Sequence, residues 1–154
     1  MQNYKVGIIG CGNIARSHAN AYQKIPNVKI ITGSELDSER REKFAEDFGL
    51  RTSYENYAEM LDNEELDLVS VCTWPKTHCD ATCKAAHTGV KGIMCEKPMA
   101  LNLNEADQML EACEKNSVRL AIGHQHRFDS QLVKARDLIN QKAVGEVSII
   151  WGHC

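Results

Sequence analysis

A glycine-rich segment with the sequence G-C-G-N-I-A, at residues 10–15, constrains the fold of this chain more than any other feature. It follows an apolar run, Lys5–Gly10, that is typical of a buried strand, and it opens a helical pattern over Asn13–Lys24. A G-x-G-x-x-A pattern between a strand and a helix is typical of the first turn of a dinucleotide-binding unit. The segment therefore predicts a nucleotide site on this turn.

Each position of this pattern has a physical role. Gly10 permits the tight turn, Gly12 lets the backbone approach a pyrophosphate, and the small Ala15 lets the helix pack closely on the strand. The phosphates would bind the free N–H groups at the start of the helix, where Asn13 and Ile14 lie, because the helix dipole favours negative charge there.

The rest of the sequence alternates apolar runs with helical patterns, which indicates a parallel sheet with helices on both faces. Further strands are predicted at 28–34, 51–53, 66–73, 92–95 and 118–123, and further helices at 37–48, 56–61, 77–87, 104–115 and 130–141. The predicted class is therefore α/β, a doubly wound parallel sheet of the NAD(P)-binding Rossmann type.

A last apolar run, Glu146–Trp151, has no obvious neighbour with which to pair as a strand. We therefore expect it to belong to a second α/β domain of which this chain carries only the start. The predicted division is a dinucleotide-binding domain over 1–124 and the first helix and strand of a truncated substrate domain over 125–154.

Composition excludes several classes of function. The 154 residues suffice for one compact domain, and 43% hydrophobic residues are ordinary for a soluble one. A formal net charge of −3 gives no attraction to nucleic acid or to an anionic membrane. Neither a signal peptide nor a membrane span is predicted, so we expect a cytoplasmic protein.

The seven cysteines are odd in number and are predicted to be free, mostly buried thiols. Cys79, Cys83 and His87 follow one another at i, i+4 and i+8, which places them on one helix face. A tetrahedral metal site rarely draws all its ligands from one helix, so we interpret this stripe as a packing face and predict no metal.

A carboxylate is expected at the end of the second strand, where it would accept hydrogen bonds from the adenine ribose. Glu35 is the candidate. Its charge would repel a 2′-phosphate, which favours NAD, whereas Arg40 and Arg41 close by in sequence leave NADP open. The alternative is that Glu35 and Asp37 are only a solvated strand end and a helix cap.

The fourth strand ends in a polar segment. Thr73, Trp74, Pro75 and His78 come directly after it, at the edge where open α/β sheets bind ligands. We expect these four residues to line the middle of the cofactor site.

The fifth strand ends in Glu96-Lys97-Pro98 at the same edge. Taken in isolation, Glu96 and Lys97 are a charged pair at a strand end, and such pairs are more often solvated than catalytic. At this position Lys97 can place an ammonium beside a substrate hydroxyl and its developing alkoxide. Glu96 can orient the nicotinamide ribose, and Pro98 fixes the turn that holds both.

With these motifs, the chain resembles the N-terminal half of the glucose–fructose oxidoreductase, inositol dehydrogenase and rhizopine-catabolism (Gfo/Idh/MocA) family. The matching segments are the glycine pattern at 10–15, Ala45–Gly49, Asp67–Val71, Thr73 with His78, Glu96-Lys97-Pro98, and Gly123–Phe128. The resemblance covers nearly the whole chain, and Glu-Lys-Pro in its strand–turn context is its most specific element.

The resemblance implies an NAD(P)-dependent dehydrogenase that transfers a hydride between the nicotinamide and a hydroxyl-bearing carbon of a sugar, cyclitol or related polyol. The lysine that corresponds to Lys97 would contact the reacting hydroxyl, with an acid and a histidine supplied by a second domain. Gln125 corresponds to an amide-bearing position near the cofactor. Trp74 departs from a proline common in the family. A homo-oligomer is a further expectation.

Two other interpretations remain open at this point. The chain could be a stand-alone NAD(H)-binding or regulatory module without catalysis. It could also be a fragment whose last strand pairs with a partner chain. Under the dehydrogenase interpretation, we expect the chain by itself to have little or no turnover.

Overall fold

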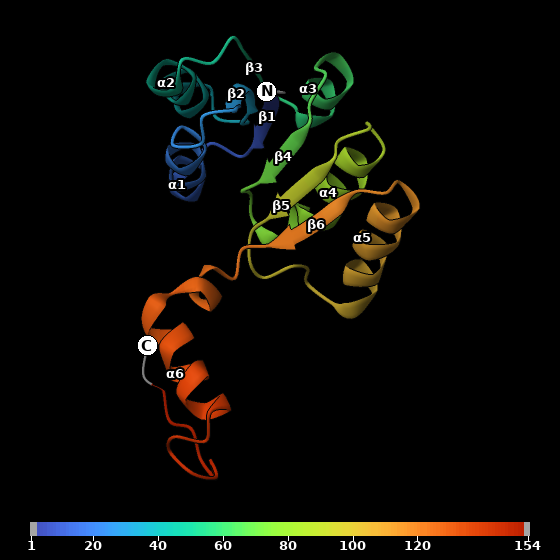
Figure 1. The fold of residues 1–154 in the computed structure, drawn as a ribbon. Helices are drawn as coiled ribbons and strands as arrows, with labels where there is room; N and C mark the ends of the chain where they lie inside the picture. Colours follow the sequence, from blue (N-terminus) through green and yellow to red (C-terminus); the bar gives the residue numbers. More distant parts are fainter. Residues whose placement is uncertain (1–2, 153–154) are drawn as a thin grey trace. The chain divides into compact units, whose positions relative to one another are not determined.

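The computed structural model describes residues 3–152, which form two compact units, one up to Gly123 and one from His124 on. The first unit contains a six-stranded sheet in which every strand pair is parallel, in the order β3-β2-β1-β4-β5-β6 (Figure 1). The strands are β1 (Tyr4–Ile9), β2 (Val28–Ser34), β3 (Thr52–Tyr54), β4 (Leu68–Val71), β5 (Gly92–Cys95) and β6 (Arg119–Ile122). The predicted doubly wound parallel sheet is confirmed.

Helices cover both faces of this sheet (Figure 1). They are α1 (Asn13–Tyr22), α2 (Ser38–Phe48), α3 (Tyr57–Asn63), α4 (His78–Ala86) and α5 (Leu103–Lys115). The second unit contains a 3-10 turn, η2 (Gln125–Phe128), followed by α6 (Ser130–Asn140).

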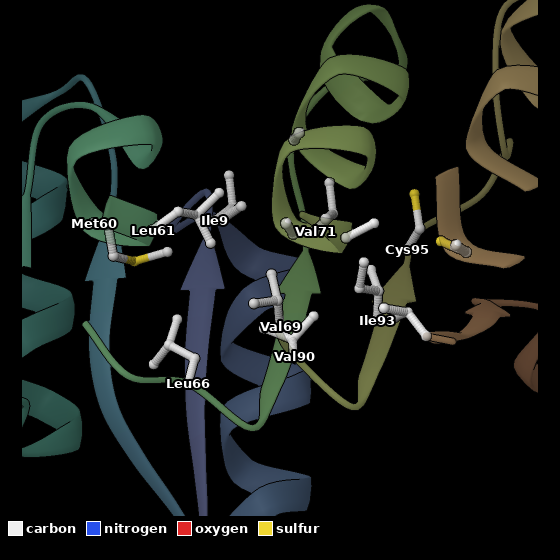
Figure 2. Close-up of a cluster of buried hydrophobic side chains, with 14 of the residues drawn as sticks. Ile9, Met60, Leu61, Leu66, Val69, Val71, Val90, Ile93 and Cys95 are labelled. Atoms are coloured by element: carbon white, nitrogen blue, oxygen red, sulfur yellow. The ribbon is translucent and has the colours of Figure 1, made fainter. Parts of the chain in front are cut away.

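The alternation of side chains along β1 divides the core into two layers. Val6 and Ile8 point to one face, where they pack with Ala15, Ala19 and Phe44 of α1 and α2. Because successive residues of a strand point to opposite faces, Ile9 joins the other layer. Figure 2 shows that second layer on the side of α3 and α4, with Met60 and Leu61 of α3 beside Ile9 and with Val69 and Val71 on β4.

The small side chains of α1 explain how closely it lies on the sheet. Ala15 and Ala19 are fully buried, so the helix approaches the strands without a large side chain between them. The strand order reverses direction at β1, which has β2 on one side and β4 on the other. In open α/β sheets, the crevice at the carboxyl ends of the strands beside this point is where ligands bind.

Side-chain caps fix the starts of several helices. Asp37, Asn56, Asn102 and Asp129 each accept a backbone N–H from the first turn of α2, α3, α5 and α6. The helix α2 ends at Gly49 in the left-handed conformation, with φ of 62°. Helix α1 differs because the residue that precedes it in the N-cap position is Gly12, which has no side chain to cap it.

Two sequence predictions need correction. The helix expected from Thr77 is preceded by a 3-10 turn, η1 (Pro75–Thr77), because Pro75 fixes the first position of that turn. The strand predicted over Glu146–Trp151 is wrong, since the structure describes no strand between residues 146 and 152. An extended segment forms a strand only beside a partner, and the described part of the second unit provides none.

Candidate functional site

A cleft of about 1110 Å³ opens at the carboxyl edge of the sheet. The turns that follow β1, β2, β3 and β4 form it. Eight of the residues predicted to contact a cofactor line this cleft: Gly10, Gly12, Asn13, Ile14, Glu35, Arg40, Thr73 and Trp74. Residues predicted from three separate segments of the sequence are therefore brought to one site.

The glycine turn is shaped for a ligand. Gly10 has φ of 87°, and a Cβ added to it would lie 2.9 Å from the carbonyl oxygen of Cys72, so only glycine fits. A Cβ on Gly12 would meet no heavy atom within 4 Å. The first turn of α1 also contains no acidic residue. The N-terminus of α1 is thus left open to the cleft and can bind an anion with its N–H groups.

Glu35 is held at the wall of the cleft. Its carboxylate accepts hydrogen bonds from the backbone N–H of Cys11 at 3.0 Å and of Asp37 at 3.3 Å. The guanidinium of Arg40 lies 4.0 Å away, and Arg41 donates to the carbonyl of Glu35 at 2.6 Å. The side chain is only 15% exposed, so the carboxylate has a fixed position with acceptor capacity left for a ribose hydroxyl.

Positive charge outnumbers negative charge along the cleft. Its lining includes the cations Arg16, Arg40, Lys43, Lys76 and Lys84, against the two carboxylates of Glu35 and Glu55. Arg16 is paired with Asp47 at 2.5 Å, and Lys84 lies 3.9 Å from Asp80. The remaining excess of positive charge suits a ligand that carries phosphate groups.

The segment after β4 divides into exposed and buried residues. Trp74 is 79% exposed in the cleft lining, and Pro75 follows it at the start of η1. His78 is fully buried and does not line the cleft. Its two ring nitrogens lie 2.9 Å from the carbonyl oxygen of Pro98 and 3.0 Å from that of Thr73. His78 therefore joins the turns after β4 and β5, and its contact with a cofactor remains a prediction.

The turn after β5 places two charged side chains in opposite environments. Lys97 is exposed. Glu96 is buried, and its carboxylate lies 3.0 Å from Nε2 of His18 and accepts the backbone N–H of Lys97 at 3.1 Å. Lys97, Glu96 and Pro75 are outside the set of residues that line the cleft. Lys97 is thus exposed, whereas the carboxylate of Glu96 is turned inward. The contact of Lys97 with a substrate remains a prediction.

Gln125 lies in the second unit, exposed at the start of η2. Its contact with the nicotinamide end of a cofactor also remains a prediction.

Sequence reasoning missed several residues of the cleft. Glu55, Asn56 and Tyr57 line it from the turn after β3. The rule that the carboxyl ends of parallel strands share one edge could have found them, but β3 is short and its pattern is weak. His18, which lies outside the cleft lining and contacts the carboxylate of Glu96, was missed as well. The helical spacing of Ala15, His18 and Tyr22 could have placed its ring on the inner face of α1.

The stripe Cys79, Cys83 and His87 makes packing contacts. The two thiols lie against backbone carbonyl oxygens of α5, at 3.5 Å and 3.6 Å, and Nδ1 of His87 bonds the carbonyl of Cys83. Among residues 3–152, no group of three or more His, Cys, Asp or Glu side chains could hold a metal ion. Within the same residues, no helix is long and apolar enough to cross a membrane.

A doubly wound sheet with a glycine turn at its switch point and a carboxylate at the end of β2 defines a dinucleotide-binding domain. The model of the Gfo/Idh/MocA family, described as an oxidoreductase family with an NAD-binding Rossmann fold, matches residues 4–124. The chain belongs to this family.

Known relatives agree with this assignment. The chain is 35% identical over 151 residues to glucose-6-phosphate 3-dehydrogenase of Bacillus subtilis, covering 97% of this chain and 41% of that protein. It is 32% identical over 153 residues to D-apiose dehydrogenase of Paraburkholderia graminis, covering 99% and 40%. The crystal structure of myo-inositol 2-dehydrogenase from Lactobacillus plantarum superimposes with a TM-score of 0.88 at 28% identity, covering 95% and 43%. The chain thus spans about two fifths of the length of these relatives.

Proposed function

We propose that this chain is the nucleotide-binding part of an NAD-dependent dehydrogenase. The enzyme would transfer a hydride between the nicotinamide and a hydroxyl-bearing carbon of a sugar or cyclitol. Support comes from the family, from relatives named for a sugar, a sugar phosphate and an inositol, and from the geometry of the cleft. The observation that carries the proposal is the exposed Lys97, which follows β5 at the same edge of the sheet as the open glycine turn.

The residues of the cleft fit the adenine side of a dinucleotide. The uncapped start of α1 offers the N–H groups of Asn13 and Ile14 to the diphosphate, over the open space at Gly12. Glu35 would accept hydrogen bonds from the hydroxyls of the adenine ribose. The exposed indole of Trp74 would cover the middle of the cofactor.

When bound, NAD⁺ would supply the acceptor for the hydride of the substrate carbon. Lys97 would donate a hydrogen bond to the substrate oxygen and stabilise the alkoxide charge that develops there as a base from the rest of the enzyme takes the hydroxyl proton, and this charge is consumed when the hydride leaves the carbon. Pro98 and the buried Glu96 hold the turn that carries this ammonium. Gln125 would contact the nicotinamide end.

Calorimetric titration of the chain with NADH and with ADP tests the cofactor part of this proposal. We expect saturable binding of both, abolished by Gly12→Trp, whose side chain would occupy the open space above the turn. A folded chain, by circular dichroism, that binds neither nucleotide would contradict the proposal.

The chemical part is tested by Lys97 variants in a chain that includes the rest of the enzyme. NADH formation is followed with a panel of cyclitols and sugars. We expect turnover of Lys97→Met to fall on the order of a hundredfold or more, while its NADH affinity stays at the wild-type value. This is the pattern expected when a group that stabilises charge in the transition state is removed. Equal turnover of Lys97→Met and wild type would contradict the assigned role.

The same proposal places the protein in the cytoplasm. The six thiols that the structure describes are all free, which suits a reducing compartment. A homo-oligomer is also part of this proposal, and sedimentation of the purified protein tests it.

A further inference from the structure

The buried carboxylate of Glu96 is held by a histidine that is distant from it in the sequence. His18 lies on α1, 78 residues before Glu96, and its Nε2 is 3.0 Å from Oε1 of that carboxylate. The two side chains are 11% and 7% exposed. A carboxylate buried to this extent requires hydrogen-bond donors, because an unpaired charge in the interior is costly.

Both nitrogens of the imidazole have polar partners. A carboxylate only accepts hydrogen bonds, so Nε2 carries the proton. The other ring nitrogen, Nδ1, lies 3.2 Å from the hydroxyl of Ser70, with the thiol of Cys72 at 3.6 Å as a second contact. The hydroxyls of Ser70 and Tyr22 form a further hydrogen bond at 2.8 Å. Every member of this chain of hydrogen bonds therefore has a partner, and the ring cannot rotate freely.

The other oxygen of Glu96 connects the network to the turn after β5. Oε2 accepts the backbone N–H of Lys97 at 3.1 Å. Gly123, which follows β6, leaves the room for this arrangement, since a Cβ added there would lie 2.7 Å from Oε1. Three elements, α1, β4 and the end of β6, thus determine where one carboxylate sits, and that carboxylate holds the backbone of Lys97.

We propose that His18 and Glu96 form a buried positioning pair that fixes the Lys97 turn and thereby the nicotinamide end of the site. In this assignment neither side chain touches the cofactor. The expectation that Glu96 itself contacts the nicotinamide ribose is replaced by a role exerted through the backbone of Lys97. The inference rests on the proposed function for its effect on cofactor binding, but not for its effect on the turn.

Two amide variants of His18 separate the contact with Glu96 from the contact with Ser70. The side chain of His18→Gln is long enough to place an N–H near the position of Nε2, so it can still donate to Glu96. His18→Asn places its amide near the position of Nδ1, so it reaches Ser70 but not Glu96. Gly123→Ala acts independently of His18, because its methyl group would displace the Glu96 carboxylate.

The first measurement is hydrogen exchange of backbone amides by NMR, without cofactor. In His18→Asn and in Gly123→Ala we expect the protection of the Lys97 amide to fall roughly tenfold. A change of this size is expected when one hydrogen bond to a charged group is lost. In His18→Gln it should stay near the wild-type value. The amide of Ile8 in the centre of the sheet reports the global stability and should change little.

The second measurement compares NADH with ADP, which lacks the nicotinamide riboside, by calorimetry. We expect His18→Asn to weaken NADH by roughly tenfold while ADP is unaffected, and His18→Gln to restore the NADH affinity. The positioning role would be contradicted if His18→Asn left unchanged both the protection of the Lys97 amide and the ratio of NADH affinity to ADP affinity. The positioning role would also be contradicted if the amides of Ile8 and Lys97 lost protection equally and His18→Gln restored neither protection nor NADH affinity relative to His18→Asn. That result would assign His18 a purely structural role. A wild-type chain that binds neither nucleotide would instead refute the proposed function, and the exchange data would still decide whether the pair fixes the turn.

Discussion

The carboxylate of Glu35 accepts a hydrogen bond from the backbone N–H of Cys11 at 3.0 Å. This contact joins the end of β2 to the middle of the glycine turn, which are 24 residues apart in sequence. The residue expected to recognise the adenine ribose is therefore also a support of the turn expected to bind the diphosphate. A change at Glu35 that removes its charge but keeps its shape separates these two roles.

We predict that Glu35→Gln shifts the cofactor preference toward NADPH by roughly tenfold or more. The amide oxygen still accepts from Cys11, whereas the negative charge that repels a 2′-phosphate is gone and Arg40, now 4.0 Å from that carboxylate, becomes available to the phosphate. The ratio of dissociation constants for NADH and NADPH is the measurement. Glu39→Gln is the matched control, since it removes the same charge from the exposed first turn of α2 outside the cleft. Equal ratios in the two variants would refute this role of Glu35.

Gly12→Asp should change stability and cofactor binding in opposite directions. With φ of −78° Gly12 has a backbone conformation open to any residue, and its Cβ would enter free space. An aspartate there would cap α1 and favour its dipole, adding about 0.3–1 kcal/mol to the free energy of unfolding. The same carboxylate would occupy the anion site, so NADH affinity should fall by on the order of a hundredfold.

Urea denaturation and calorimetry measure the two effects of Gly12→Asp. Gly10→Ala is the contrasting variant, in which the substitution is strained. Residue 10 has φ of 87°, and the added methyl group would lie 2.9 Å from the carbonyl oxygen of Cys72. We expect it to cost about 1–3 kcal/mol of stability. Wild-type NADH affinity in Gly12→Asp would show that the start of α1 does not bind the diphosphate.

Local patterns were sufficient for the sheet and for part of the lining of the cleft. Gly10, Gly12 and Glu35 could be predicted because a strand, a tight turn, a helix and a second strand follow one another closely in sequence. The common edge of parallel strands then placed Thr73 and Trp74 beside them. These predictions required only the order of the elements.

The inward environment of Glu96 could not be predicted in the same way. Its partner His18 is 78 residues away, and the two meet only because the fold places α1 beside β4, where His18 and Tyr22 contact Ser70. The strand predicted over 146–151 failed for a related reason. Apolar residues such as Ile149 and Trp151 have the composition of a strand, but pairing depends on a neighbour that a pattern within one segment does not reveal.

The buried thiols should resist alkylation in the folded protein. Burial, followed by the nearby charge of Glu35, raises the pKa of Cys11 to about 12, and burial raises the pKa of Cys95 to about 11. Because the thiolate is the reactive form, both should react slowly near pH 7 in buffer and readily in concentrated urea. Iodoacetamide labelling followed by peptide mass spectrometry measures each cysteine separately. Rapid labelling of Cys11 in the folded chain would show that the glycine turn opens.

Acid sensitivity should depend on Glu64, which is buried between β3 and α3. Burial by itself would raise the pKa of this carboxyl, but hydrogen bonds from Thr52 at 2.5 Å, Tyr54 at 3.0 Å and Arg51 at 2.5 Å outweigh it and lower the pKa below its ordinary value of 4.5. A carboxyl with a lowered pKa in the folded state stabilises the fold at pH values above 4.5, and this contribution is lost as the pH falls through the lowered value.

Glu64→Gln should therefore be less stable than wild type by about 1–3 kcal/mol near neutral pH, with a difference that shrinks as the solution is made acidic. Urea denaturation at a series of pH values measures it. The neighbouring Glu65→Gln is the control, because that side chain is 96% exposed and its ion pair with Lys5 at 3.4 Å contributes little. If the two variants lose the same stability at every pH, the three hydrogen bonds to Glu64 do not hold β3 against α3 in solution.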